Sequence, residues 1–211
     1  KRNHVKKREY VEAKQLLRKY SCDDDFFKNQ CPDMAYVLGF IAADGSIARK
    51  ENGVFINLAA ADGEILERMA VSMKLTRPIS YYTKKQTGQE LCKLSVFSHE
   101  WKHDLEKYGI TPVKTFTLQP PLLLSKKYYA DYIRGYFDAD GSVYARHNKR
   151  LPDRAGVKIT GASKATMEWI RDTLANQYNI YTPSFRIQHV SDGKTTMYEW
   201  ALYNKAMAQR F

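Results

Sequence analysis

The chain has 211 residues, 44% of them hydrophobic, and 34 Lys and Arg against 23 Asp and Glu give a formal net charge of +11. Such a length can form one ordinary domain or two small ones, and the positive excess favours nucleic acid as a partner before a membrane surface. The three cysteines are far apart and form no Cys-x-x-Cys pair, which argues against a disulfide framework or a zinc site and favours a reducing, intracellular setting. No apolar run approaches the roughly 20 residues of a membrane span.

In the first part of the chain, residues 1–30 form a basic extension, which is either a solvated leader or an arm along a phosphate backbone. Pro32 and Asp33 predict the start of a helix, and Asp44-Gly45 predicts its end. The alternation and turn residues that follow predict a hairpin, a helix capped by Asp62, a second hairpin and another helix, over 46–50 and 54–60, 63–73, 77–84 and 91–97, and 99–108.

A connector rich in proline separates this part from a second one with the same order of elements. The second part is expected as a helix at 126–139, strands at 142–146 and 154–160 around a longer loop, a helix capped by Ser163, strands at 183–189 and 196–203, and the beginning of a last helix at Asn204. The predicted boundaries are 31–111 for the first half, 112–127 for the linker and 128–211 for the second half, with its C-terminal helix incomplete.

The predicted fold class is α+β, a pseudo-twofold pair of αββαββα units. Each unit has one antiparallel sheet with helices on a single face. One pattern marks the repeat: Tyr36–Ser46 and Tyr132–Ser142 both read Tyr, two spacers, Gly, two large apolar residues, a small or acidic residue, Ala, Asp, Gly and Ser. Repetition at such a distance indicates two copies of one structural unit.

Each copy has a glycine inside its helix, Gly39 or Gly135, where glycine costs about 1 kcal/mol relative to alanine. Close backbone contact between two helices would offset this cost twice. We therefore expect the two motif helices to pack against each other and to form the joint between the halves.

Each copy also ends on an aspartate, Asp44 or Asp140, where the helix dipole disfavours an anion by about 0.3–1 kcal/mol. A single Asp-Gly helix end is usually only a terminator, but two at the same register on adjacent helices bring two carboxylates together. Such a pair needs protonation or bridging cations, and hard divalent cations prefer oxygen ligands. Paired metal ions about 3.5–4 Å apart can stabilise both oxygens of a phosphodiester displacement. With the basic charge, the pattern favours a nuclease that cuts both strands of a duplex.

The two motifs resemble the LAGLIDADG homing endonuclease family in its single-chain, two-motif form, and the likeness extends from about residue 31 to residue 211. The resemblance implies a site-specific DNA endonuclease that makes a double-strand break at a long, asymmetric target. It also implies catalytic Asp44 and Asp140, with the backbone carbonyls of Ala43 and Ala139 completing the metal site. The implied cofactor is two or three Mg²⁺ ions, with Mn²⁺ or Ca²⁺ as substitutes in crystals.

The resemblance further implies a catalytic Lys114, which matches a lysine that often follows the first half in this family and would polarise water or stabilise charge near the phosphate. The alternative is a connector lysine in water. The sixth motif position is Ala42 in the first copy and Asp138 in the second. The matching lysine of the second half is expected beyond the last helix, so either the chain is truncated or the active site is asymmetric. The differences between the two copies predict that the two strands are not cut by identical machinery.

Outward-facing strand residues of the types that hydrogen-bond base edges are expected to contact DNA in the major groove. The predicted DNA-binding set is Ser46, Lys50, Asn57, Lys84, Lys93, Ser142, Tyr144, Arg146, Asn148, Arg154, Lys158, Thr160, Arg186 and Gln188. The alternative for each is an ordinary polar face of a strand.

The expected partner is double-stranded DNA, bound by a monomer with internal pseudo-twofold symmetry and no membrane association. The expected location is the cytoplasm of a bacterium or phage-infected cell, or an organelle matrix. An intron is one of several origins that remain open. Two alternatives remain for the function: an RNA maturase that assists intron splicing, and a catalytically dead DNA-binding protein on the same fold.

Overall fold

The structure is a computed structural model, and it describes residues 19–148, 151–182, 184–189, 196–203, 208 and 211. It contains two antiparallel four-stranded sheets with strand orders β1-β2-β4-β3 and β5-β6-β8-β7. The same order in both sheets confirms the predicted α+β fold. Within the described residues, every helix is too short or too polar to cross a membrane.

The first sheet and its helices follow the predicted order. The strands are β1 (Ser46–Ile47), β2 (Gly53–Ala59), β3 (Ser80–Thr83) and β4 (Glu90–Phe97), and the helices are α2 (Pro32–Ala43), α3 (Gly63–Ser72) and α4 (His99–Lys107). The core-facing side of the sheet is apolar because Cys92, Leu94 and Val96 alternate with more exposed residues along β4.

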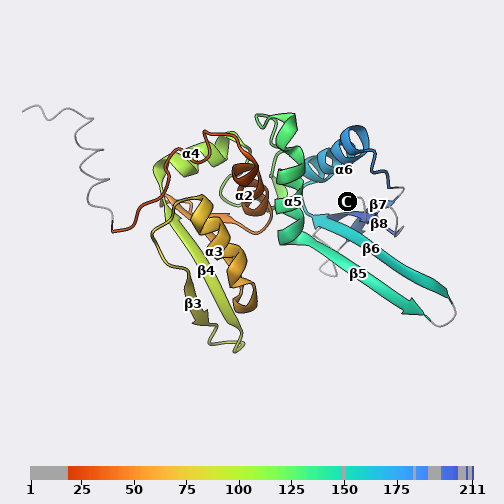
Figure 1. Cartoon of the computed structure of the whole chain (residues 1–211), viewed down its shortest axis with the longest axis horizontal. Coiled ribbons are helices and arrows are strands. Elements are labelled where there is room, and N and C mark those ends of the chain that lie inside the picture. Colours follow the sequence, from red (N-terminus) through yellow and green to blue (C-terminus); the bar gives the residue numbers. More distant parts are fainter. Residues whose placement is uncertain (1–18, 149–150, 183, 190–195, 204–207, 209–210) are drawn as a thin grey trace, which may run out of the picture.

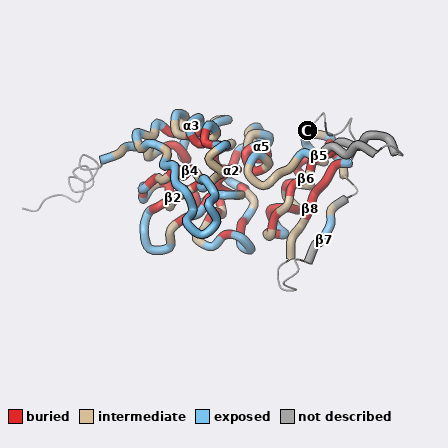
Figure 2. Tube along the Cα trace, turned by 90° about the horizontal axis from the view of Figure 1, so that it is seen from below, coloured by how far each residue is buried: buried red, intermediate tan, exposed pale blue. Residues whose placement is uncertain are grey.

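The second sheet repeats this arrangement. Its strands are β5 (Gly141–Asn148), β6 (Leu151–Gly161), β7 (Ser184–His189) and β8 (Thr196–Leu202), and its helices are α5 (Tyr129–Asp140) and α6 (Lys164–Tyr178). Ser163 caps α6 as predicted, since its hydroxyl accepts a hydrogen bond from the Thr166 amide. Figure 2 shows buried residues in β6 and β8 and also in the elements of the first half.

The two motif helices, α2 and α5, lie side by side between the two sheets (Figure 1). A Cβ atom at Gly39 would overlap the carbonyl oxygen of Tyr132, and one at Gly135 would overlap the carbonyl oxygen of Tyr36. Only glycine permits this approach of two backbones. The predicted joint is therefore present, with the same contact made from both sides.

Three local predictions were wrong. The first strand ends at Ile47 instead of residue 50, because the Lys102 ammonium donates hydrogen bonds to the carbonyls of Ala48 and Arg49. Asp62 lies at the N-cap of α3 but its side chain makes no capping bond. The 3₁₀ turn at Ala60–Asp62 runs directly into α3, so the Gly63 amide is satisfied by the Ala60 carbonyl instead.

The longer loop expected between 146 and 154 was also wrong, because β5 and β6 continue to Asn148 and from Leu151 and form a projecting two-stranded arm (Figure 1). Pro152 is accommodated there because β8 pairs with β6 only from Val157 onward, which leaves one edge open. The expected leader helix and the expected last helix at Asn204 lie outside the described residues, apart from isolated positions near the C-terminus.

Candidate active site

Two aspartates mark the C-terminal ends of the paired helices. Asp44 is the C-cap of α2, and its backbone amide donates to the carbonyls of Phe40 and Ile41. Asp140 is the last residue of α5. Since α2 and α5 meet symmetrically at their glycines, both aspartates lie at the same end of the joint, and the charge of Asp44 reaches Asp140.

The electrostatic environment disfavours the charged form of both carboxyls. Burial, and then the negative charge of Asp44, raises the pKa of Asp140 to about 6, against the attraction of Lys114. Burial also raises the pKa of Asp44, and Lys114 again opposes the shift. Carboxylates held together at this cost are suited to bind a cation.

Lys114 approaches this pair from the connector. It begins a short 3₁₀ turn (Lys114–Phe116), its side chain is only 9% exposed, and its Nζ donates to the carbonyl of Ala43 over 2.6 Å. Burial lowers the pKa of Lys114, while the charges of Asp140 and Asp44 act to raise it. The structure thus brings together the three residues that the sequence marked as catalytic candidates.

The donor atoms at this site fit a hard divalent cation. Two carboxylates with the carbonyls of Ala43 and Ala139 are oxygen ligands of the kind that Mg²⁺ prefers. The Ala43 carbonyl keeps one lone pair beyond its bond with Lys114. A cavity of about 380 Å³, lined by Asp44, Ala139 and their neighbours, opens beside these groups. The described residues contain no group of three His, Cys, Asp or Glu side chains arranged to hold a metal, so backbone, water or phosphate oxygens would complete the coordination.

The sixth motif position distinguishes the two copies. Asp138 accepts a hydrogen bond of 2.8 Å from the Tyr36 hydroxyl across the joint, and the Arg134 guanidinium lies 5.0 Å from the centre of the Tyr36 ring. Burial, followed by the bond to Asp138, raises the pKa of Tyr36. Ala42, at the matching position of α2, is buried.

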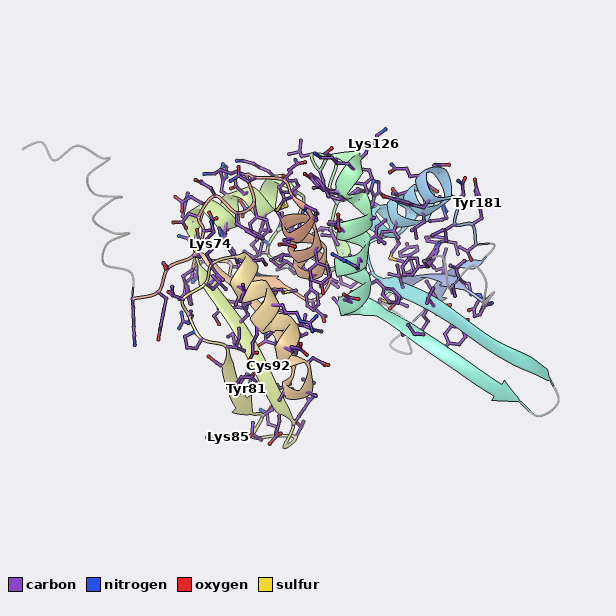
Figure 3. The ribbon with its side chains drawn as sticks, viewed as in Figure 1. Lys74, Tyr81, Lys85, Cys92, Lys126 and Tyr181 are labelled. Carbon is purple, nitrogen blue, oxygen red and sulfur yellow. The ribbon has the colours of Figure 1, made fainter. Side chains whose placement is uncertain are left out.

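In the first sheet, the face opposite the core carries three of the predicted DNA contacts. Ser46 pairs with Phe55 and Asn57 pairs with Lys93, and residues directly opposite each other in an antiparallel sheet share a face. Lys50 and Lys84 lie in exposed positions beyond strand ends. Figure 3 shows Lys85, the neighbour of Lys84, at the far tip of the β3–β4 hairpin.

In the second sheet, the open face contains Ser142 opposite Lys158, and Thr160 and Arg186 on either side of Glu199. Lys158 lies 3.7 Å from the carboxylate of Glu199, which offsets part of its charge.

Tyr144, also on this face, donates to the Leu202 carbonyl at 3.3 Å. The backbones of Arg146 and Arg154 are paired, but the side chains of these two residues, and those of Asn148 and Gln188, lie outside the described residues.

Sequence reasoning missed a row of aromatic and cationic side chains on the first sheet. The Arg77 guanidinium lies between the rings of Tyr20 and Phe97, 5.1 and 5.2 Å from their centres. Phe97 contacts Phe55 edge to face at 5.6 Å, and Lys93 Nζ lies 4.3 Å from the Phe55 centre. The signal was present, because Phe55 and Phe97 occupy the outward positions of alternating strands, where only polar residues had been considered.

A family model described as "LAGLIDADG-like domain" matches residues 127–211. Two curated relatives are the DNA-directed RNA polymerase subunit Rpo1C of Methanocaldococcus jannaschii (26% identity over 151 residues) and the ribonucleoside-diphosphate reductase NrdEB subunit alpha of Bacillus subtilis (24% over 194 residues). The matches cover 71% and 82% of this chain but only 16% and 17% of those relatives.

Among solved structures, the homing endonuclease I-WcaI bound to its DNA recognition sequence matches with a TM-score of 0.57 and 14% identity over 83% of this chain and 79% of that one. I-DmoI in complex with DNA and Mn matches with a TM-score of 0.53 and 15% identity, covering 85% and 93%. Full-length DUF199/WhiA from Thermatoga maritima matches with a TM-score of 0.55 and 16% identity, covering 89% and 57%. Residues 127–211 therefore match a LAGLIDADG-like domain, and the described chain as a whole has the fold of these structures, with its two motif helices packed together between the sheets.

Proposed function

We propose that this protein is a metal-dependent DNA endonuclease that makes a double-strand break at a long, asymmetric target. The observation that carries the proposal is the meeting of Asp44 and Asp140 with the buried Lys114 at the end of the helix joint. The fold itself requires neither two repelling carboxylates nor a buried lysine at this place, so the presence of these groups favours a catalytic role over a structural one.

Each residue has a role that follows from its position. Asp44 and Asp140, with the carbonyls of Ala43 and Ala139, would hold Mg²⁺. When bound, such ions supply charge neutralisation at the attacking and leaving oxygens of a phosphodiester. Lys114 would orient water or stabilise negative charge on the phosphate from the first-half side, where it contacts Ala43.

The two sheets would bind the duplex. A two-stranded ribbon fits the major groove, and the β5–β6 arm has that form. On the first sheet we add Arg77 to the proposed contacts alongside Lys93, because aromatic rings hold both cations in place and so reduce the entropy lost on binding. The likeness to I-WcaI, whose structure was solved with its DNA recognition sequence bound, supports this use of the fold.

We further propose that the protein acts as a monomer inside a cell, whether bacterial, phage-infected or organellar. The two curated relatives belong to unrelated enzymes, and this chain spans only about one sixth of either. A match of this size supports the view that this chain is a module with an activity separate from polymerase or reductase chemistry. We include an intron among the proposed genetic origins of the chain, with an intein or a free-standing gene as the alternatives.

An RNA-binding role is the second candidate, and one observation favours it. Phe97, 44% exposed, and its neighbour Phe55 lie on the open face of a four-stranded sheet, an arrangement that stacks unpaired bases in RNA-binding sheets. A maturase would use this surface without needing the two aspartates. A DNA-binding protein without activity is the third reading, since only some of the structural neighbours are named as endonucleases.

The deciding experiment exposes a plasmid library with randomised inserts to the protein in Mg²⁺ or in EDTA. We expect cleavage of a small set of sites in Mg²⁺ only, lost in Asp44→Asn and retained in Asp33→Asn, which alters an exposed carboxylate at the other end of α2. Absence of cleavage at every site would refute the nuclease. Parallel filter binding to duplex DNA and to single-stranded RNA would then separate the other two readings.

A further inference from the structure

Within the connector, the segment from Lys114 to Leu118 contacts both halves at two points only a few residues apart. Lys114 donates through Nζ to the Ala43 carbonyl of the first half at 2.6 Å. Leu118, in the same segment, presents its carbonyl to the second half, where it accepts hydrogen bonds from Ser163 Oγ at 2.6 Å and Thr166 Oγ1 at 3.0 Å. The segment that carries the lysine is therefore attached to both halves.

Short backbone bonds connect these two points rigidly. The amides of Thr117 and Leu118 both donate to the Lys114 carbonyl, at 2.9 and 2.8 Å. Fixing the Leu118 carbonyl therefore fixes the turn on which Lys114 sits. Val113, directly before the lysine, has φ 64° and ψ 37°, a left-handed conformation that a β-branched residue rarely adopts. Its side chain is 60% exposed, so packing of Val113 does not explain that conformation. Strain of this kind persists where surrounding contacts impose it.

The hydroxyls of Ser163 and Thr166 are well placed to hold the Leu118 carbonyl. Ser163 and Thr166 are 4% and 0% exposed, and they lie at the start of α6. The Ser163 hydroxyl serves twice, since it accepts from the Thr166 amide at 3.3 Å and donates to Leu118. A carbonyl oxygen at a helix N-terminus is also favoured by the helix dipole. The buried apolar side chain of Leu118 keeps the connector close, but only the hydrogen bonds define its register.

We propose that Ser163 and Thr166 are positioning residues for Lys114: helix α6 of the second half holds Leu118, and through the 3₁₀ turn keeps the lysine of the first half on Ala43. The lysine is then in place only while both halves are docked as in the structure. The part of this inference that concerns cleavage rests on the proposed endonuclease function, whereas the positioning itself does not.

The first test uses Thr166→Val, which removes one hydroxyl and nearly conserves shape. Thr173→Val is the matched control, because Thr173 is a buried threonine on the same helix, 6% exposed. In single-turnover cleavage at saturating DNA, we expect Thr166→Val to be about tenfold slower than wild type, as misplacement of a catalytic group would produce. We expect Thr166→Ser and Thr173→Val to stay within about twofold of wild type, with DNA affinity unchanged in all three.

A double-mutant cycle separates positioning from general damage. If Thr166 acts through Lys114, Thr166→Val should cause no further slowing in a Lys114→Met background. Equal slowing in both backgrounds would overturn the inference.

A second readout does not depend on nuclease activity. Acetylation of individual lysines by acetic anhydride, followed by mass spectrometry, should label Lys114 slowly in the wild type and several times faster in Thr166→Val. Lys164, whose side chain is 62% exposed, serves as the internal standard. Equal Lys114 labelling in Thr166→Val and Thr173→Val would refute the positioning role. Faster labelling in a protein that cuts no DNA would support positioning and refute the endonuclease.

Discussion

Replacement of Asp140 by asparagine should stabilise the metal-free protein at neutral pH. The pKa of Asp140 is raised from 3.8 to about 6 by burial and by the charge of Asp44. An acid whose pKa is higher in the folded state contributes stability that is present below the unfolded pKa and lost as the pH rises through the folded value. The wild type should therefore lose stability between about pH 4 and pH 6, and a neutral amide should avoid this loss.

The magnitude follows from the shift. About 2 pKa units at 1.36 kcal/mol each give an upper limit near 3 kcal/mol. Part of this gain is offset, because the charge of Asp140 also stabilises the buried ammonium of Lys114. We expect a net gain of about 1–3 kcal/mol, which corresponds to a melting temperature higher by roughly 2–12 °C for a chain of this size.

The assay is thermal unfolding in EDTA at pH 7.5 and pH 4.5, with Asp33→Asn as the control for an exposed carboxylate. Asp140→Asn should melt above the wild type at pH 7.5, and the difference should shrink towards zero at pH 4.5. Added Mg²⁺ should stabilise the wild type more than the variant, as ligand linkage requires. If Asp140→Asn unfolds below the wild type at pH 7.5 without metal, the carboxylate is well satisfied in the fold and the reasoning fails.

Four further predictions concern the same regions. Asp44→Asn and Asp140→Asn should each abolish double-strand cleavage while DNA affinity stays equal or rises, as measured by gel shift; loss of binding in both would indicate a structural role instead. Lys114→Met should slow single-turnover cleavage at least about tenfold, and an unchanged rate would remove Lys114 from the site. Gly39→Ala should cost about 3 kcal/mol or more in urea unfolding, because the added methyl overlaps backbone and not a movable side chain; a cost below about 1 kcal/mol would contradict the close joint. DNA affinity should fall steeply with salt, and Arg77→Gln should either reduce the salt slope by about 1, as for a phosphate contact, or relax preference at one base pair; no change in either would exclude Arg77 from the interface.

The joint and its aspartates were predictable from the sequence, whereas the contacts of the connector were not. Gly39 and Gly135 are costly inside helices, and the same cost occurring twice leaves few explanations other than mutual contact. Lys114 was identified only by its resemblance to a family lysine. The contact that holds its segment joins Leu118 to Ser163, which lies 45 residues further along the chain. No local pattern records such a contact.

The missed aromatic row has a different origin. The alternation of β2 places Phe55 on the outward face of the sheet, but only polar residues were considered as candidates for that face. The extent of the β5–β6 arm was also missed, because the strands were expected to end at residue 146 and to resume at residue 154, whereas they run to Asn148 and from Leu151.

The symmetric contact between α2 and α5 has a consequence for how such proteins diversify. The spacing of the two aspartates is set by the contact between the main chains of α2 and α5, and it depends on very few side chains. The outward faces of the sheets can therefore change without altering the geometry between the acids. The matching structures share this fold at only 14–16% identity. We therefore expect variation to concentrate on the open sheet faces, where residues can be exchanged one at a time without disturbing the helix joint.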